Sequence, residues 1–156
     1  MRAPDGDETT EPSLRVAFVC VKNAGRSQMA AALAERERER RGLDGAVEVL
    51  GGGTDPAVDV HDVVVRAMAE LDVDLSGVRP REISPEELRA VDLVVTMGCS
   101  AEDVCPATWR GDARDWALDD PAGRSLDEVR EIRDEIEARV NALFDEIEAQ
   151  LEGQVA

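Results

Sequence analysis

The chain has 156 residues, of which 43% are hydrophobic; this is enough for one domain with a buried core and argues against global disorder. Its 35 acidic residues outnumber the 18 basic ones, only one of which (Lys22) is a lysine, and the formal net charge is −17. So acidic a chain argues against nucleic acid and anionic membranes as partners, and an anionic substrate must be attracted by a local cationic site.

The composition also indicates where the protein works. An acidic, arginine-based, aromatic-poor chain is typical of adaptation to a concentrated salt cytoplasm, where a Debye length of ~3 Å at molar salt makes self-repulsion tolerable; a high-GC codon bias is the alternative explanation. The chain contains no run of about 18 apolar residues, so no transmembrane helix is expected. Residues 1–12 are polar and acidic, unlike a signal peptide, so we expect a disordered tail, a single domain over 13–151 and a cytoplasmic location.

Hydrophobic periodicity predicts that strands and helices alternate along the chain. In chain order we expect a strand over 14–19, a helix over 27–41, a strand over 46–50 stopped by glycines 51–53, a helix over 59–71, a short helix over 84–89, a strand over 91–97, a short strand over 115–118 and a long helix over 125–151. This alternation predicts an α/β fold with three layers, in which a four-stranded parallel sheet carries helices on both faces.

Marked residues follow three of the predicted strands, namely Cys20, the pair Gly98-Cys99, and the pair Asp119-Asp120. In open parallel sheets, ligands bind at the carboxyl ends of the strands. We therefore expect these residues to meet in one crevice.

The segment 20–27, Cys-Val-Lys-Asn-Ala-Gly-Arg-Ser, connects the first strand to the first helix. Backbone N–H groups of such a loop, together with the positive end of the helix, form a site for a tetrahedral oxyanion. Arg26 can bind two oxygens of the anion, and the same positive environment favours the nucleophilic thiolate of Cys20. Asn23 and Gly25 suit the positive φ of a tight loop. The alternative, that Cys20 is merely a buried strand-end residue, does not explain these neighbours together.

Residues 16–30 resemble the anion loop of the low-molecular-weight protein tyrosine phosphatase superfamily, and most closely that of the arsenate reductases that share its fold. The phosphatases usually continue Arg-Ser-Pro, whereas this chain continues Arg26-Ser27-Gln28-Met29-Ala30, as the reductases do. The resemblance, which covers residues 14–143, implies that Cys20 is the nucleophile and that Ser27 stabilises its thiolate. It also implies that the oxyanion is bound by Arg26 and the loop amides of Val21, Lys22, Asn23, Ala24 and Gly25.

The pair Asp120-Pro121 gains a role from the same resemblance, although Asp-Pro is by itself a common turn. In these families the aspartate before the proline is the general acid, which would make Asp120 the donor of a proton to the departing oxygen. Phosphotyrosine phosphatases place aromatic residues after this pair, whereas this chain has Ala122-Gly123 and no tyrosine. That favours a small inorganic oxyanion as the substrate.

Two further cysteines, Cys99 and Cys105, follow the third predicted strand. A zinc site is disfavoured, because the spacing is wrong and His61 is the only histidine, so no metal is expected. The resemblance implies a thiol relay: Cys20 attacks arsenate, Cys99 attacks Cys20 and releases arsenite, and Cys105 then attacks Cys99. Two unrelated cysteines are the alternative.

The sequence does not decide which external thiol finally reduces the protein. Five residues separate Cys99 from Cys105, where thioredoxin-coupled relatives usually have six. Either thioredoxin or a low-molecular-weight thiol could serve, and no tightly bound cofactor is expected. Some relatives bind potassium through the loop asparagine and a glutamate of the first helix; Asn23 matches the former, but Ala31 stands at the latter position.

The sequence thus predicts a cytoplasmic arsenate reductase, for which phosphate or sulfate would mimic the substrate. A low-molecular-weight phosphatase acting through a Cys20 phosphoenzyme is one alternative, and an oxyanion- or redox-sensing binding protein is another. His61 is expected to be a partly exposed residue at a helix start rather than a catalytic one, and Trp109 and Trp116 to pack around the crevice.

Overall fold

A computed structural model of the chain describes residues 13–99, 109 and 111–155. The expected tail over 1–12 therefore lies outside the described residues. In chain order the elements are β1 (Leu14–Cys20), α1 (Arg26–Arg40), β2 (Val47–Gly53), α2 (Asp62–Ala69), α3 (Pro85–Arg89), β3 (Leu93–Met97), β4 (Asp112–Asp115) and α5 (Leu126–Val155).

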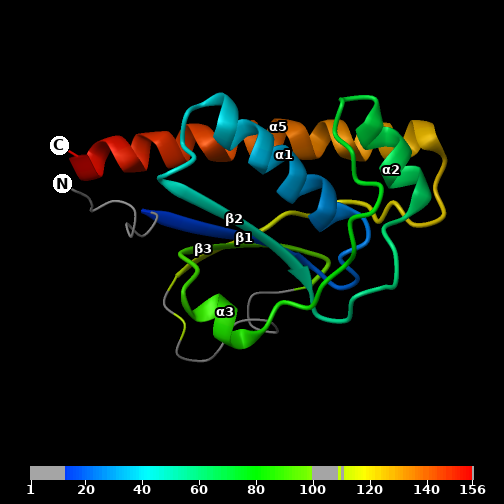
Figure 1. Cartoon of the computed structure of the whole chain (residues 1–156), viewed down its shortest axis with the longest axis horizontal. Coiled ribbons are helices and arrows are strands. Elements are labelled where there is room, and N and C mark those ends of the chain that lie inside the picture. Colours follow the sequence, from blue (N-terminus) through cyan, green and yellow to red (C-terminus); the bar gives the residue numbers. More distant parts are fainter. Residues whose placement is uncertain (1–12, 100–108, 110, 156) are drawn as a thin grey trace.

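The four strands form one sheet in the order β2-β1-β3-β4, and every neighbouring pair is parallel. Figure 1 shows α1, α2 and α5 on one side of this sheet and the short helix α3 on the other. The predicted three-layer α/β fold is therefore confirmed. The register aligns Cys20 with Gly53 on one side and with Met97 on the other, which brings three strand ends to one edge.

Side chains of β1 alternate between two hydrophobic cores, as the pleat of a strand requires. Val16 and Phe18 face the larger core, which α1, α2 and α5 cover. Ala17 and Val19 face a smaller core on the other face, where Leu88 of α3 packs. Burial on both faces explains why β1 reads as a continuous apolar run.

The glycine triplet 51–53 was expected to stop the second strand, and that prediction was wrong. All three glycines belong to β2 and pair with Phe18, Val19 and Cys20. Close packing accounts for them: a Cβ on Gly52 would lie 2.6 Å from the Cβ of Ile83, and one on Gly53 would lie 2.5 Å from the carbonyl oxygen of Val21. Glycine lets the neighbouring loops approach the strand.

The fourth strand covers Asp112–Asp115 rather than residues 115–118. It is an edge strand of largely exposed polar residues, and such edges are commonly charged because charge blocks unwanted pairing. The sequence-based prediction relied on hydrophobicity and therefore placed the strand at Trp116 and Leu118, which in the structure follow it. The described residues contain no helix that is both long and apolar enough to cross a membrane.

Candidate active site

The loop between β1 and α1 is held from outside by its carbonyl oxygens. The carbonyls of Cys20, Val21, Lys22 and Ala24 accept hydrogen bonds of 2.8–3.2 Å from backbone amides of the segment 54–61. With these oxygens engaged on the outer side, the N–H groups of the loop are available to the cavity that it lines. The local geometry is that of an anion-binding loop at a helix N-terminus.

Asn23 and Gly25 have different conformations in this loop, although both were expected to have positive φ. Asn23 does, with φ +52°, whereas Gly25 has φ −145°. The prediction for Gly25 was wrong. A glycine is needed there for space, since a Cβ would lie 2.6 Å from Cγ of Pro121.

Cys20 lies at the carboxyl end of β1, is only 3% exposed, and accepts hydrogen bonds at its sulfur from two sides. The backbone amide of Asn23 donates to Sγ over 3.2 Å. The Ser27 hydroxyl lies 2.8 Å from the same sulfur. Because the Asn23 side chain donates from Nδ2 to the Ser27 oxygen over 2.7 Å, the hydroxyl keeps its own hydrogen for the sulfur. Both contacts stabilise a thiolate.

Arg26 lies between two cavities, of about 510 and 500 Å³, and lines both of them. Cys20 lines the first cavity, and Cys99 lines the second. The Arg26 guanidinium donates to the carbonyl oxygen of Leu118 over 3.1 Å, and Gly98, with φ +85°, leaves room for it: a Cβ there would lie 2.9 Å from Nη2. Its neighbours thus hold the guanidinium beside the anion loop.

The two aspartates before Pro121 face different cavities. Asp120 lines the Cys20 cavity, with Oδ2 3.9 Å from Arg26, while Asp119 lines the Cys99 cavity. The Asp120 side chain is 59% exposed and its Oδ1 accepts a hydrogen bond of 3.0 Å from the amide of Ala122. Of the pair, only Asp120 is placed to exchange a proton with a group bound at Cys20.

Cys99 is brought to the same strand edge from β3. Its thiol donates over 3.7 Å to the carbonyl oxygen of Val19, the residue immediately before Cys20. Cys105, the third thiol of the expected relay, lies outside the described residues. The structure therefore places Cys20, Arg26, Ser27, Asp120 and Cys99 at one edge of the sheet, but around two cavities that share Arg26 rather than in the single crevice expected.

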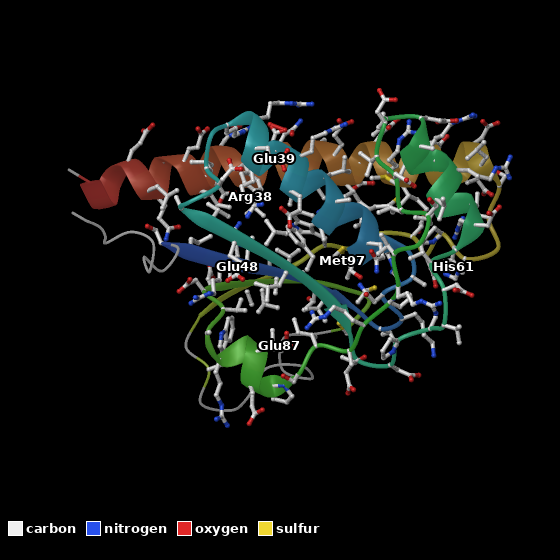
Figure 2. The ribbon with its side chains drawn as sticks, viewed as in Figure 1. Arg38, Glu39, Glu48, His61, Glu87 and Met97 are labelled. Atoms are coloured by element: carbon white, nitrogen blue, oxygen red, sulfur yellow. The ribbon has the colours of Figure 1, made fainter. Side chains whose placement is uncertain are left out.

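Three neighbours of the site had no expected part in it. His61, whose amide donates to Ala24, lines the Cys20 cavity from the start of α2, and Figure 2 shows it on the side toward which the β2 arrowhead points. Gln28 and Arg81 both contact the side chain of Asn23. Gln28 directly follows the loop, so its place in the sequence could have suggested a part in the site. Arg81 contributes its backbone amide, and the identity of its side chain gives no sign of that.

The two tryptophans lie on opposite faces of the sheet. Trp116 packs against Phe18 with ring centroids 5.8 Å apart and lines the cavity of Cys99, as expected. Trp109 packs against the smaller core, where its Nε1 donates to the carbonyl of Val91 over 2.8 Å. Both indole rings serve packing.

The groups around Asn23 do not form a binding site for a potassium ion. The Asn23 Oδ1 atom already accepts hydrogen bonds from Gln28 and Arg81, and the methyl group of Ala31 lines the adjoining cavity beside Gly51. Within the described part of the chain, no group of three or more His, Cys, Asp or Glu side chains could hold a metal ion.

Comparison with known proteins identifies similar sequences and structures. Residues 15–153 match the family described as low molecular weight phosphotyrosine protein phosphatase. A Halobacterium salinarum protein, provisionally named an arsenate reductase, is 55% identical over 88% of this chain and 96% of its own length. The arsenate reductase of Brevibacillus brevis is 38% identical over 79% of this chain and 88% of its own.

Among solved structures, a thioredoxin-dependent arsenate reductase of Corynebacterium glutamicum superposes with a TM-score of 0.74 at 34% identity. The match covers 92% of this chain and 66% of the longer one, just under two thirds.

Proposed function

Because the chain belongs to the low molecular weight phosphotyrosine protein phosphatase family, and because a second thiol, that of Cys99, contacts the backbone carbonyl of the residue before Cys20, we propose that it is an arsenate reductase. The position of Cys99 carries this proposal. Hydrolysis of a phosphate ester requires only Cys20, the anion loop and an acid, whereas reduction requires a thiol that can reach the Cys20 sulfur. The relatives named as arsenate reductases support the same choice.

In the first step, arsenate binds to the loop amides and the Arg26 guanidinium. The Cys20 thiolate attacks arsenic, and an S–As bond forms as one As–O bond breaks. Asp120 gives a proton to the departing oxygen, which leaves as water. Donors fixed in advance around the developing charge lower the barrier to this step.

In the second step, the Cys99 thiolate attacks the sulfur of Cys20. The electron pair of the S–As bond stays on arsenic, which is thereby reduced from As(V) to As(III) and leaves as arsenite. The two cysteines are oxidised to a disulfide, which requires their Cα atoms to come within about 7 Å. The origin of both residues at adjacent strand ends makes this approach short.

In the third step, Cys105 attacks Cys99 and restores the Cys20 thiolate. The disulfide now joins Cys99 and Cys105, and an external thiol reductant returns two electrons and two protons. A thioredoxin-like protein is the favoured reductant, since one similar structure is thioredoxin-dependent; a low-molecular-weight thiol is the alternative.

A coupled assay tests the proposal. We expect the wild-type protein to consume NADPH in the presence of arsenate, thioredoxin and thioredoxin reductase, or reduced small thiol with its own reductase, while Cys20→Ser, Cys99→Ser and Cys105→Ser do not turn over. If Cys99→Ser and Cys105→Ser both reduce arsenate normally, the relay is wrong. Rapid hydrolysis of aryl phosphates without arsenate consumption would favour the phosphatase, and tight oxyanion binding without either reaction would favour a sensor.

We further infer that the protein works in the cytoplasm of a cell with a high internal salt concentration. The net charge of −17 and the 55% identical relative from Halobacterium salinarum, a halophile, support this setting. A reducing cytoplasm also suits a site that must keep its thiols reduced between turnovers.

A further inference from the structure

Gln28 binds Asn23 at two points from the first turn of α1. Its Nε2 donates to the side-chain oxygen of Asn23 over 2.9 Å and to the backbone oxygen of Asn23 over 3.0 Å. Gln28 is only 9% exposed, and Asn23 only 2%. Both acceptors of the left-handed residue of the loop are therefore held by one buried side chain.

The backbone amide of Arg81 requires the same orientation of the Asn23 side chain as Gln28 does. This amide can only donate, and it lies 3.0 Å from Asn23, so the atom that faces it must be the oxygen. The other end of the same group, Nδ2, consequently faces Ser27. If the carboxamide turned over, its oxygen would accept the Ser27 hydrogen and withdraw it from the Cys20 sulfur.

Arg81 is itself anchored to neighbouring elements. Its guanidinium donates to the carbonyl of Gly51 over 2.6 Å and pairs with the carboxylate of Glu87. Glu87 belongs to the capping box of α3, where its carboxylate also accepts from the amide of Ser84 over 3.0 Å, and Figure 2 shows it on the side of the sheet opposite α1. The backbone amide of Arg81, which faces Asn23, is thus held in place through contacts that reach the face of the sheet opposite α1.

We propose that Gln28 is a positioning residue for the nucleophile: by holding the Asn23 carboxamide with its oxygen away from Ser27, it directs the Ser27 hydrogen to the Cys20 sulfur. The chain of hydrogen bonds runs from Gln28 and Arg81 through Asn23 and Ser27 to Cys20. This inference rests on Cys20 being the nucleophile of the proposed function.

The test measures the rate at which iodoacetamide alkylates Cys20 between pH 5 and 9, with the Cys20 peptide followed by mass spectrometry. In Gln28→Glu a carboxylate would face both Asn23 oxygens and turn the carboxamide over, so we expect the midpoint of the pH profile to rise by about one unit, a tenfold loss of thiolate at lower pH. Gln28→Met, which removes only the donor, should shift the midpoint less because Arg81 still binds. Gln150→Met, a change at an exposed glutamine of α5, should leave it unchanged.

Two further measurements separate this role from a structural or purely electrostatic one. In a Ser27→Ala background, Gln28→Glu should barely shift the midpoint of the alkylation profile any further, since the hydrogen bond from Ser27 to the sulfur is already lost. A shift of the midpoint that persists undiminished would come from the added negative charge alone and would overturn the proposal. In the wild-type protein, the side-chain amide hydrogens of Asn23 and Gln28 should exchange slowly by NMR, and exchange as fast as at Gln150 would also overturn it.

The outcomes distinguish this inference from the proposed function. Equal midpoints for Gln28→Glu, Gln28→Met and wild type would refute the role of Gln28 and leave arsenate reduction standing. A Cys20 that stays unreactive throughout the pH range in the wild-type protein would refute both.

Discussion

Gly25 of the anion loop lies against the ring of Pro121, so closely that a Cβ on the glycine would come within 2.6 Å of the proline Cγ. The contact joins the loop that carries the nucleophile to the turn that carries Asp120, although 95 residues of sequence lie between Gly25 and Pro121. The absence of a side chain at Gly25 therefore lets the turn that carries the proposed acid approach the loop of Cys20 closely.

A Gly25→Ala substitution should push the Asp120-Pro121 turn away from the loop. We expect kcat/KM for arsenate to fall on the order of ten- to a hundredfold, because a displacement of about 1 Å is enough to cost that much. The rate of Cys20 alkylation should stay close to that of the wild-type protein, because the contacts of the sulfur are not touched. Gly45→Ala is the matched control, since no atom lies within 4 Å of a Cβ at Gly45. Equal activity of the two variants would contradict the contact.

A Gly52→Ala substitution tests why β2 contains glycines. The new methyl group would collide with the side chain and the backbone of Ile83, at 2.6 and 3.1 Å. Overpacking of this kind costs about 1–3 kcal/mol of the free energy of unfolding, which urea titration can measure. Gly45→Ala again serves as the control, and an equally stable Gly52→Ala protein would show that the loop over β2 gives way freely.

The ionisation of Glu70, which lies in the contact between α2 and α5, should make the free energy of unfolding depend on pH over a narrow range. Hydrogen bonds from Arg130 and then Arg133 lower the pKa of Glu70 from 4.5 to about 2. Because the pKa is lower in the folded state, the stabilisation is complete above about pH 4.5 and is lost as the pH falls toward 2. The urea midpoint of Glu70→Gln should lie below that of Glu131→Gln, an equally charged variant at an exposed position of α5, and the difference should shrink over this range. A difference that stays constant with pH would contradict the assignment.

The net charge of −17 predicts that the folded protein is stabilised by salt. The melting temperature should rise as NaCl increases from about 0.1 M into the molar range, because screening shortens the Debye length from ~10 Å to ~3 Å. Sucrose at matched osmolality is a control for general exclusion effects. A melting temperature that is as high in dilute buffer as in molar salt would contradict adaptation to high salt.

Local patterns in the sequence predicted much of this fold and of the site. The β1 strand, the anion loop and the short helix expected over 84–89 depend on residues close together in the chain, and all three are found in the structure. The parallel sheet followed from the alternation of elements. The convergence of Cys20 and Cys99 followed from the rule that ligands bind where parallel strands end.

The parts that could not be predicted depend on contacts between distant segments. β4 is a polar edge strand that hydrophobicity does not reveal, and the glycines of β2 are explained only by Ile83 packed above them. For Gly25 the residue type was suggestive, but the reason is Pro121 rather than the backbone angle. The orientation of Asn23 depends on Gln28 and also on the backbone amide of Arg81, and no side-chain pattern can show the latter.

We propose that Cys20 reduces arsenate with electrons from Cys99 and Cys105. The most direct test is a single turnover: fully reduced protein is mixed with excess arsenate without any external reductant, and arsenite and disulfides are then quantified, the latter by peptide mass spectrometry. We predict one arsenite per chain and a Cys99–Cys105 disulfide, and a trapped Cys20–Cys99 disulfide in Cys105→Ser. Protein that releases no arsenite and keeps all three thiols reduced would contradict the claim.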